Sequence, residues 1–435
     1  MVYGDADFRE LHAECTWGKI VTRARASSRD AFFSVLIVLW LGLCGGCALL
    51  QVFGLCSAND ASVIVVENRV REQPDAPTAE NVQTRIFQNS VEGSMRDALP
   101  FYDGAAMTKA CLERHFIKAS AGLLLESDAS YPTFYGSRYA YDPRSDSVVP
   151  FPAEKAEDLN IWLPAFSKAI NEFADLHPGI RVIYCEPTHM AFSATNPLID
   201  FTSGLMDRTF VEEHVNSLLA PNVFQVDLQA RDAAEYDSWF YRSEHHWKTE
   251  GAFEAYKRIL DVATGGAEKP LEVENIKFRI PFYGSYTRMG LCEPEEPDSI
   301  DDVLYPESNF KIVIGGLPVL MENIRHRELY DSGRMSPERY TLRYEEYFHW
   351  NLGRIDFLNN NNRNGKTLLI VADSYSNCIE RLLAEHYEKV VCVDPRVERD
   401  TIELLLLREQ KIDDVLFMMC PIVAAQPRVV SFISN

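Results

Sequence analysis

Apolar runs alternate with amphipathic stretches through much of the chain. Five short runs with few or no polar residues indicate buried strands, at 181–185, 222–228, 367–372, 389–393 and 414–420. Apolar residues at helical spacing predict helices at 159–176, 209–219, 249–260, 376–387 and 401–409. Continuous apolar strands between amphipathic helices are typical of a parallel sheet that is covered on both faces. The pattern therefore predicts an α/β fold.

The pattern is weaker outside this alternation. Residues 60–100 are polar and predict the core of an extended linker spanning 54–100, which precedes a large domain at 101–435. Within that domain, residues 105–122 fit an amphipathic helix. Tyr, Pro, Ser and Asp dominate 125–155 and indicate a loop or an irregular hairpin. The acidic stretch at about 265–350 is interpreted as an insertion.

One uncharged segment near the N-terminus is long enough to cross a membrane. Residues 31–59 carry no charge, and about twenty apolar residues span the hydrocarbon core as a helix. Lysine and arginine residues are more frequent before the segment than after it, which places a tail at 1–30 in the cytoplasm. We expect a signal-anchor helix at 31–53 and an extracytoplasmic domain, with a cleaved signal peptide ending near Ser57 as the alternative.

Charge and cysteine content narrow the class of protein further. The 435-residue chain has a formal net charge of -21, which argues against a nucleic-acid partner because phosphate backbones are repelled. Of the 10 cysteines, Cys185, Cys392 and Cys420 lie in apolar runs and are expected to be buried as small hydrophobic side chains. No Cys/His spacing resembles a zinc site.

Two polar motifs carry groups suited to chemistry, and the first is Glu244-His245-His246, just before a helix predicted from Thr249. In an extended segment Glu244 and His246 point to the same side and His245 to the other. An acid beside an imidazole can fix its tautomer and stabilise its protonated form. The nearby helix N-terminus opposes a positive charge and favours a neutral base at rest. The alternative is a set of polar residues that only cap a loop.

The second motif, 371–377, reads Val-Ala-Asp-Ser-Tyr-Ser-Asn and lies where a predicted strand ends and a helix begins. Ligands bind at the carboxyl ends of strands in open α/β sheets. The hydroxyl of Ser374 would then lie in the cleft, near helix-start N–H groups that can bind an oxyanion. The alternative is that its polar residues are helix caps. Together the motifs supply the acid, the base and the nucleophile that acyl transfer needs.

The combination of motifs resembles the DHHW family, which is similar to the SGNH hydrolase-like domain of the alginate O-acetylation proteins of the AlgX and AlgJ type. The resemblance rests on EHHW before a Gly-Ala helix, on ADSYSN, VDPR and DDVLF, and also on VENR and FYGSY. It covers most of the chain after residue 65. It implies an SGNH hydrolase-like (flavodoxin-like) fold with circularly permuted motif order, in which the acid and histidine precede the serine.

The resemblance also implies roles for individual residues. Ser374 is the implied nucleophile, His246 the base and Glu244 the orienting acid, although the family has Asp where this chain has the longer Glu. The same resemblance brings Asp394 and Arg396 near the cleft. The candidates for oxyanion or substrate binding are Asn377, Tyr375 and Arg396.

The resulting hypothesis is a membrane-anchored, serine-dependent O-acyl transferase or esterase that acts on a cell-envelope or secreted polysaccharide, with acetyl as the acyl group by resemblance. Its partners would be a polysaccharide acceptor, an acyl donor and a membrane acyl-transfer protein, and it would use no cofactor and no metal. A glycan-binding or assembly module with a weakened triad is the first alternative. A metal hydrolase that uses Glu244, His245 and His246 is the second.

Overall fold

The computed structural model describes residues 73–97, 108–113, 115–116, 139–152, 157–199, 217–320 and 343–434, with 104, 133–134 and a few positions between 34 and 70. The chain divides into two compact units. One comprises Met1–Ile64 with Arg69–Ala105, and the other comprises Val65–Asn68 with Ala106–Asn435. No helix among the described residues is long and apolar enough to cross a membrane. Most of the span predicted at 31–53 lies outside those residues, as does most of the helix predicted at 209–219.

The first unit contains short helices within the segment predicted as an extended linker. It holds the short strands β1 (Val63–Ile64) and β2 (Arg69–Val70) and two helices, α2 (Ala79–Gln83) and α3 (Ile86–Asp97). Thr78 accepts a hydrogen bond from the backbone N–H of Asn81 at 3.1 Å, which satisfies one of the free donors at the start of α2. Polar composition alone did not reveal this capped helical segment.

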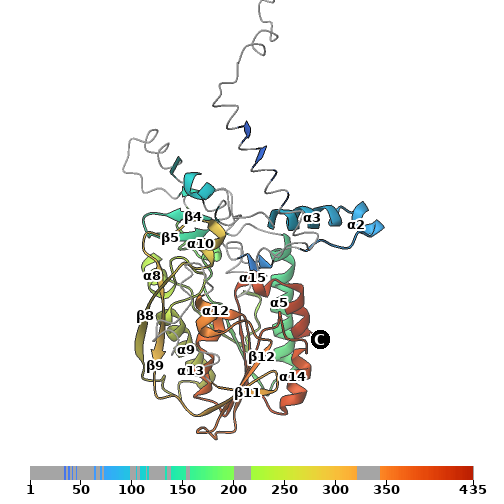
Figure 1. Ribbon diagram of the computed structural model, residues 1–435. Coiled ribbons are helices and arrows are strands. Elements are labelled where there is room, and N and C mark those ends of the chain that lie inside the picture. The colour runs from blue at the N-terminus through green and yellow to red at the C-terminus, as the bar shows by residue number, and fades with distance from the viewer. Residues whose placement is uncertain are drawn as a thin grey trace, which may run out of the picture. The chain divides into compact units, whose positions relative to one another are not determined.

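The second unit is built on one eight-stranded sheet (Figure 1). Its strand order is β11-β10-β12-β14-β13-β15-β6-β7. The five predicted strands are all present and pair in parallel: β6 (Arg181–Cys185), β7 (Val223–Val226), β13 (Thr367–Ala372), β14 (Lys389–Val393) and β15 (Asp414–Met418). The prediction of a parallel sheet is incomplete, because β10 (Phe310–Ile314), β11 (Leu317–Val319) and β12 (Arg354–Asn359) extend it with antiparallel pairs.

Helices cover the sheet, as the alternating pattern predicts. On one side α5 (Glu157–Leu176) packs with α16 (Pro427–Ser434), next to α14 (Ile402–Glu409) and α15 (Pro421–Ala424). On the other side α9 (Thr249–Thr264) contacts β6 and β7, and α13 (Glu380–Ala384) contacts β12 and β14. The core between them is apolar, and Cys185, Cys392 and Cys420 are buried free cysteines as predicted.

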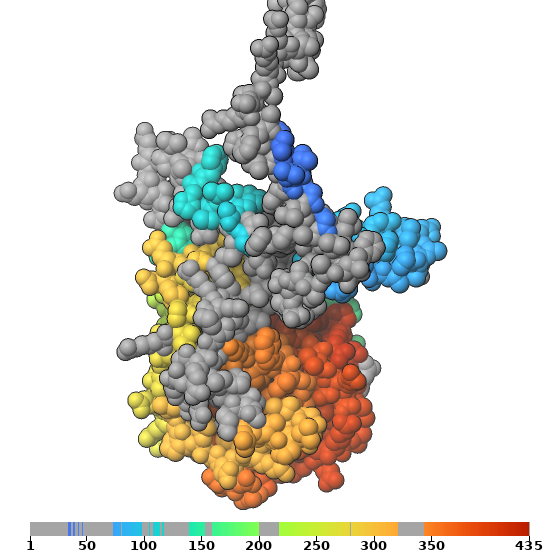
Figure 2. Space-filling view, viewed as in Figure 1, coloured from blue at the N-terminus to red at the C-terminus, as the bar shows by residue number. Residues whose placement is uncertain are grey.

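Smaller elements lie beside the main sheet and its helices (Figure 1). β3 (Thr133–Phe134), β4 (Tyr139–Asp142) and β5 (Ser147–Pro150) form an antiparallel sheet, and β8 (Glu274–Phe282) pairs with β9 (Asp298–Leu304). Three short helices complete the unit: α8 (Ala233–Trp239), α10 (Ser285–Gly290) and α12 (Arg343–Phe348). In the view of Figure 2, the yellow β8–β9 region lies on the left and the red C-terminal helices lie on the right. The segment interpreted as an insertion thus supplies two strands of the main sheet and two helices.

Candidate active site

Ser374 begins a tight turn at the carboxyl end of the central strand β13. A 3₁₀ helix, η4 (Ser374–Cys378), follows the strand directly, and its N-cap Asp373 accepts the backbone N–H of Tyr375 at 3.1 Å. The other carboxylate oxygen of Asp373 accepts the N–H of Cys420 at 2.9 Å, so this acid ties two strand ends together. The predicted helix at 376–387 is therefore split into η4 and α13. Ser374 keeps 9% of its surface exposed.

Glu244, His245 and His246 lie in a loop between α8 and α9 that is fixed at both ends. Phe240 and Trp247 form an isolated antiparallel bridge, which closes the loop on itself. The indole N–H of Trp247 donates to the sulfur of Cys378 at 2.7 Å, in the turn that carries Ser374. This contact joins the two motifs, which are more than a hundred residues apart in the sequence.

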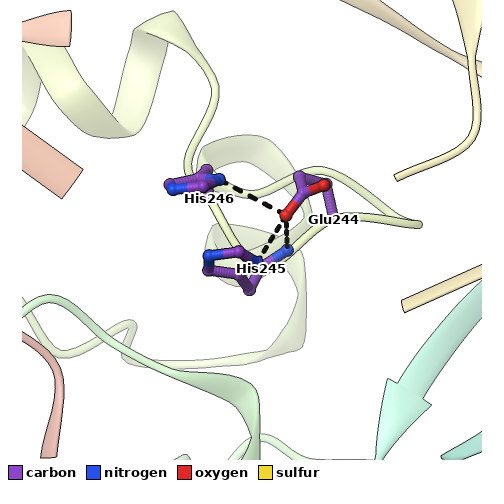
Figure 3. Close-up of side chains that lie close together, drawn as sticks. All are labelled: Glu244, His245 and His246. Atoms are coloured by element: carbon purple, nitrogen blue, oxygen red, sulfur yellow. Dashed lines mark hydrogen bonds and ion pairs between the residues drawn. The ribbon is translucent and has the colours of Figure 1, made fainter. Parts of the chain in front are cut away.

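The three residues proposed as a triad come together in the structure. The hydroxyl of Ser374 lies 2.8 Å from Nε2 of His246, which is a hydrogen-bond distance. Nδ1 of His246 lies 3.3 Å from Oε1 of Glu244 (Figure 3). That contact is close enough for electrostatic attraction, but Nδ1 has no partner among the described residues that meets hydrogen-bond geometry. Glu244 and His246 are both buried.

Other donors hold the carboxylate of Glu244 more tightly. Ser285 donates its backbone N–H to Oε2 and its hydroxyl to Oε1, each at 2.6 Å. The N–H of His245 donates to Oε1 at 2.8 Å. Ser285 belongs to the FYGSY segment, which the resemblance included without giving it a role. Its position beside the acid could not be read from spacing, because forty residues separate it from Glu244.

His245 corrects the expectation from strand alternation. Its Nδ1 lies 2.5 Å from Oε1 of Glu244, so both histidines approach the same carboxylate oxygen (Figure 3). The segment is a tight loop rather than a strand, so alternate side chains need not point to opposite sides. The hydroxyl of Ser285 is also 2.8 Å from Nδ1 of His245.

Burial, together with the charges of His245 and Arg396, leaves His246 as a neutral base. Burial lowers the pKa of His246 to about 3, and the positive fields of His245 and Arg396 act in the same direction against the attraction of Glu244. Burial also lowers the pKa of His245, but the charge and hydrogen bond of Glu244 outweigh this effect and raise it overall. Burial raises the pKa of Glu244, yet the two imidazoles bring it well below its ordinary value. Glu244 is therefore ionised, and its carboxylate interacts with both His245 and His246.

The three remaining candidates, expected to bind the oxyanion or the substrate, all contact other groups of the protein. Tyr375 donates its hydroxyl to the carbonyl of His245 at 2.6 Å and its N–H to Asp373, so both of its donors are used within the protein. Asn377 donates to the carbonyl of His349 at 3.2 Å. Arg396 forms a bidentate pair with Asp394, at 3.0 and 2.7 Å, and its charge reaches His246 and Asp373. Their roles in oxyanion or substrate binding stay predictions.

A polar cavity lies beside the nucleophile turn. Asp373, Ser376 and Asn377 line it from that turn. Cys392 and Val393 line it from β14, and Asp394 directly after the strand. Glu244, His245 and His246 could also hold a metal ion, since their ligand atoms lie within 4.8 Å of one another. However, the carboxylate of Glu244 already accepts three hydrogen bonds, and Nε2 of His246 is hydrogen-bonded to Ser374. A metal ion would have to compete with these hydrogen bonds.

Comparisons with known proteins support the fold. A DHHW family protein from Eubacterium siraeum DSM 15702 matches with a TM-score of 0.50 at 17% identity, over 66% of this chain and 92% of that one. Bacillus cereus PatB1 matches with a TM-score of 0.51 at 17% identity, over 65% and 96%, and a second PatB1 structure carries a sulfonyl adduct. The O-acetyltransferase domain of Pseudomonas putida AlgJ covers 70% of this chain, at 11% identity and 99% of its own length, but its TM-score of 0.36 carries no argument.

The predicted likeness to the DHHW family is thus confirmed at the level of the fold. No family model matches the chain, and no curated protein matches it either. At these identities the solved structures establish the architecture and leave the chemistry to be argued from the residues of this chain.

Proposed function

We propose that the chain is a serine-dependent O-acyl transferase or esterase. The observation that carries this proposal is the 2.8 Å contact between the hydroxyl of Ser374 and Nε2 of His246, with Glu244 on the far side of the imidazole. A weak nucleophile becomes reactive when a neutral base takes its proton, and the lowered pKa of His246 keeps that base neutral.

In the acylation step, Oγ of Ser374 attacks the carbonyl carbon of an ester, and the proton of the hydroxyl moves to Nε2 of His246. A bond forms between Oγ and the carbonyl carbon, and a negative charge develops on the carbonyl oxygen. The ester C–O bond then breaks, and the leaving alcohol takes the proton from His246. The nearby carboxylate of Glu244 stabilises the transient imidazolium.

In the second step, an acceptor hydroxyl or water attacks the acyl group on Ser374. His246 again takes the proton and returns it to Oγ, so that the free serine is regenerated. A sugar hydroxyl as acceptor gives transfer, and water gives hydrolysis. Arg396 is our candidate for electrostatic stabilisation of the oxyanion, because its positive charge reaches His246 and Asp373.

The substrate class and the location belong to the same proposal. We infer an acyl group as small as acetyl, and an acceptor in a cell-envelope or secreted polysaccharide. The resemblance to the DHHW family and the uncharged segment at 31–59 support this inference. An acyl donor protein in the membrane would be the natural partner of an enzyme anchored by one span.

The test uses the purified full-length chain with 4-nitrophenyl acetate and a sulfonyl fluoride. A sulfonyl probe is chosen because PatB1, which shares the fold, has a structure with a sulfonyl adduct. We expect acetyl ester turnover that is lost in Ser374→Ala, with a drop of several orders of magnitude as for other triads. Ser238→Ala, which removes the hydroxyl of an exposed serine on α8, serves as the matched control.

Two other outcomes of this test would favour the alternative functions. The family has Asp where this chain has Glu244, and Nδ1 of His246 lacks a partner with hydrogen-bond geometry. A folded wild-type protein that neither turns over the ester nor reacts with the sulfonyl fluoride would therefore favour a glycan-binding module. Activity that survives in Ser374→Ala but is lost on metal removal would favour a hydrolase that binds its metal through Glu244, His245 and His246.

A further inference from the structure

Two aromatic rings lie against the imidazole of His246. The ring of Tyr344, from α12, stacks on it with a centroid distance of 3.7 Å and an interplanar angle of 4°. The ring of His245 lies 3.8 Å from it at 37°. Two rings at these distances cannot share one face without overlapping, so they lie on opposite faces. His246 therefore sits in a slot between Tyr344 and His245.

Hydrogen bonding does not fix the imidazole of His246 at Nδ1. Nδ1 of His246 has no partner with hydrogen-bond geometry among the described residues, and Oε1 of Glu244 is taken by Ser285 and His245. An imidazole whose only hydrogen bond is at Nε2 can still rotate about its Cα–Cβ and Cβ–Cγ bonds. The ring planes on either side restrict that motion and leave Nε2 directed at Ser374.

Tyr344 is itself held firmly. It is fully buried, and its ring packs on Phe348 of the same helix with a centroid distance of 4.7 Å. Its hydroxyl reaches the backbone carbonyl of Ser374 at 3.5 Å, a long contact that contributes little energy. The face of an aromatic ring also attracts a cation, so the stack favours the imidazolium that forms during acylation.

We propose that Tyr344 is a positioning residue of the base: its ring, with that of His245, holds His246 in line with Ser374 and adds to the 3.3 Å contact between Nδ1 of His246 and Glu244. The proposal deepens the proposed function and rests on it for the catalytic readout. It assigns to α12 a role that neither the sequence motifs nor their spacing indicated.

The experiment compares Tyr344→Phe, which keeps the ring, with Tyr344→Leu, which removes it. We expect Tyr344→Phe to keep kcat for 4-nitrophenyl acetate within about twofold. Tyr344→Leu should lower kcat about tenfold, in line with the upper range for a ring stack, while KM changes less than threefold. Tyr347→Leu is the matched control, because Tyr347 is equally buried on the same helix but contacts Phe278 and Phe348 instead of His246.

A second measurement does not depend on turnover. In full-length protein labelled at histidine Cε1, the His246 resonance, assigned by its loss in His246→Asn, should be shifted upfield by the two rings. In Tyr344→Leu it should move downfield, whereas in Tyr347→Leu it should stay. An unshifted wild-type resonance, or a folded Tyr344→Leu with wild-type kcat, would overturn the proposal. Absent turnover with the expected shifts would instead refute the proposed function and leave the slot established.

Discussion

Gly284 is the point where the acid of the site is most sensitive to a single added methyl group. A Cβ at this position would lie 2.4 Å from Cβ of Glu244, 2.7 Å from its Cα and 2.5 Å from the carbonyl oxygen of Ser243. Two of these three atoms belong to the backbone, so no side-chain rotation relieves the clash. The φ of Gly284 is -77°, so the substitution adds no conformational strain and acts through the clash alone.

The size of the effect of Gly284→Ala follows from these distances. An ordinary contact of about 3.4 Å or more requires the two segments to separate by roughly 1 Å, and misplacement on that scale can lower a rate about 10²-fold. The same overpacking should cost about 1–3 kcal/mol of the free energy of unfolding. We expect kcat for 4-nitrophenyl acetate to fall about 10²-fold, because Ser285 moves with residue 284 and releases Glu244.

The assay is steady-state kinetics on the full-length protein, with unfolding followed in parallel. Gly179→Ala is the matched control, since a Cβ there meets nothing within 4 Å and its rate should match the wild type. A Gly284→Ala protein that is folded and has wild-type kcat would refute the reasoning. It would mean that the position of Glu244 does not matter for turnover.

Three further predictions concern charge. Because burial lowers the pKa of His246 to about 3, ester turnover measured from pH 8 to 4 should stay level at pH 5, below the ordinary imidazole value of about 6.5. Burial also lowers the pKa of His189 to about 3, so the unfolded chain binds more protons, and urea unfolding should show stability falling from about pH 6.5 toward 3. Glu244→Gln should lose about 1–3 kcal/mol of stability and most of its activity, because its NH₂ must face the N–H of either Ser285 or His245. These expectations would be contradicted by retention of both stability and activity in Glu244→Gln, by ester turnover that falls near pH 6.5, or by stability that does not decrease between pH 6.5 and 3.

The sheet was predictable because its strands are buried on both faces. Residues 368–372 and 390–393 are apolar without interruption, a pattern that is typical of a covered parallel strand. The antiparallel strands β10, β11 and β12 were missed because they are short or mix polar with apolar residues: β11 has three residues including a proline, and β12 reads RIDFLN. The helices of the first unit were missed for the same reason, as short polar helices carry a weak periodic signal.

The site was predictable as a set of residues but not as a geometry. The acid–histidine motif and the serine turn each carry local signals, and the structure brings His246 and Ser374 to 2.8 Å. The direction of His245 was wrong because the loop is not extended. Ser285 and Tyr344 come from distant segments, and one sequence contains no information on which distant segments meet.

The central claim is that Ser374 is a nucleophile activated by His246. Its most direct test is mass spectrometry of the full-length protein after reaction with a sulfonyl fluoride, followed by peptide mapping. The account predicts a single sulfonyl group on Ser374, formed at a rate that falls sharply in His246→Ala and is unchanged in Ser238→Ala, which alters an exposed serine of α8. No label on Ser374 in folded wild-type protein, or labelling that is equally fast without His246, would contradict it.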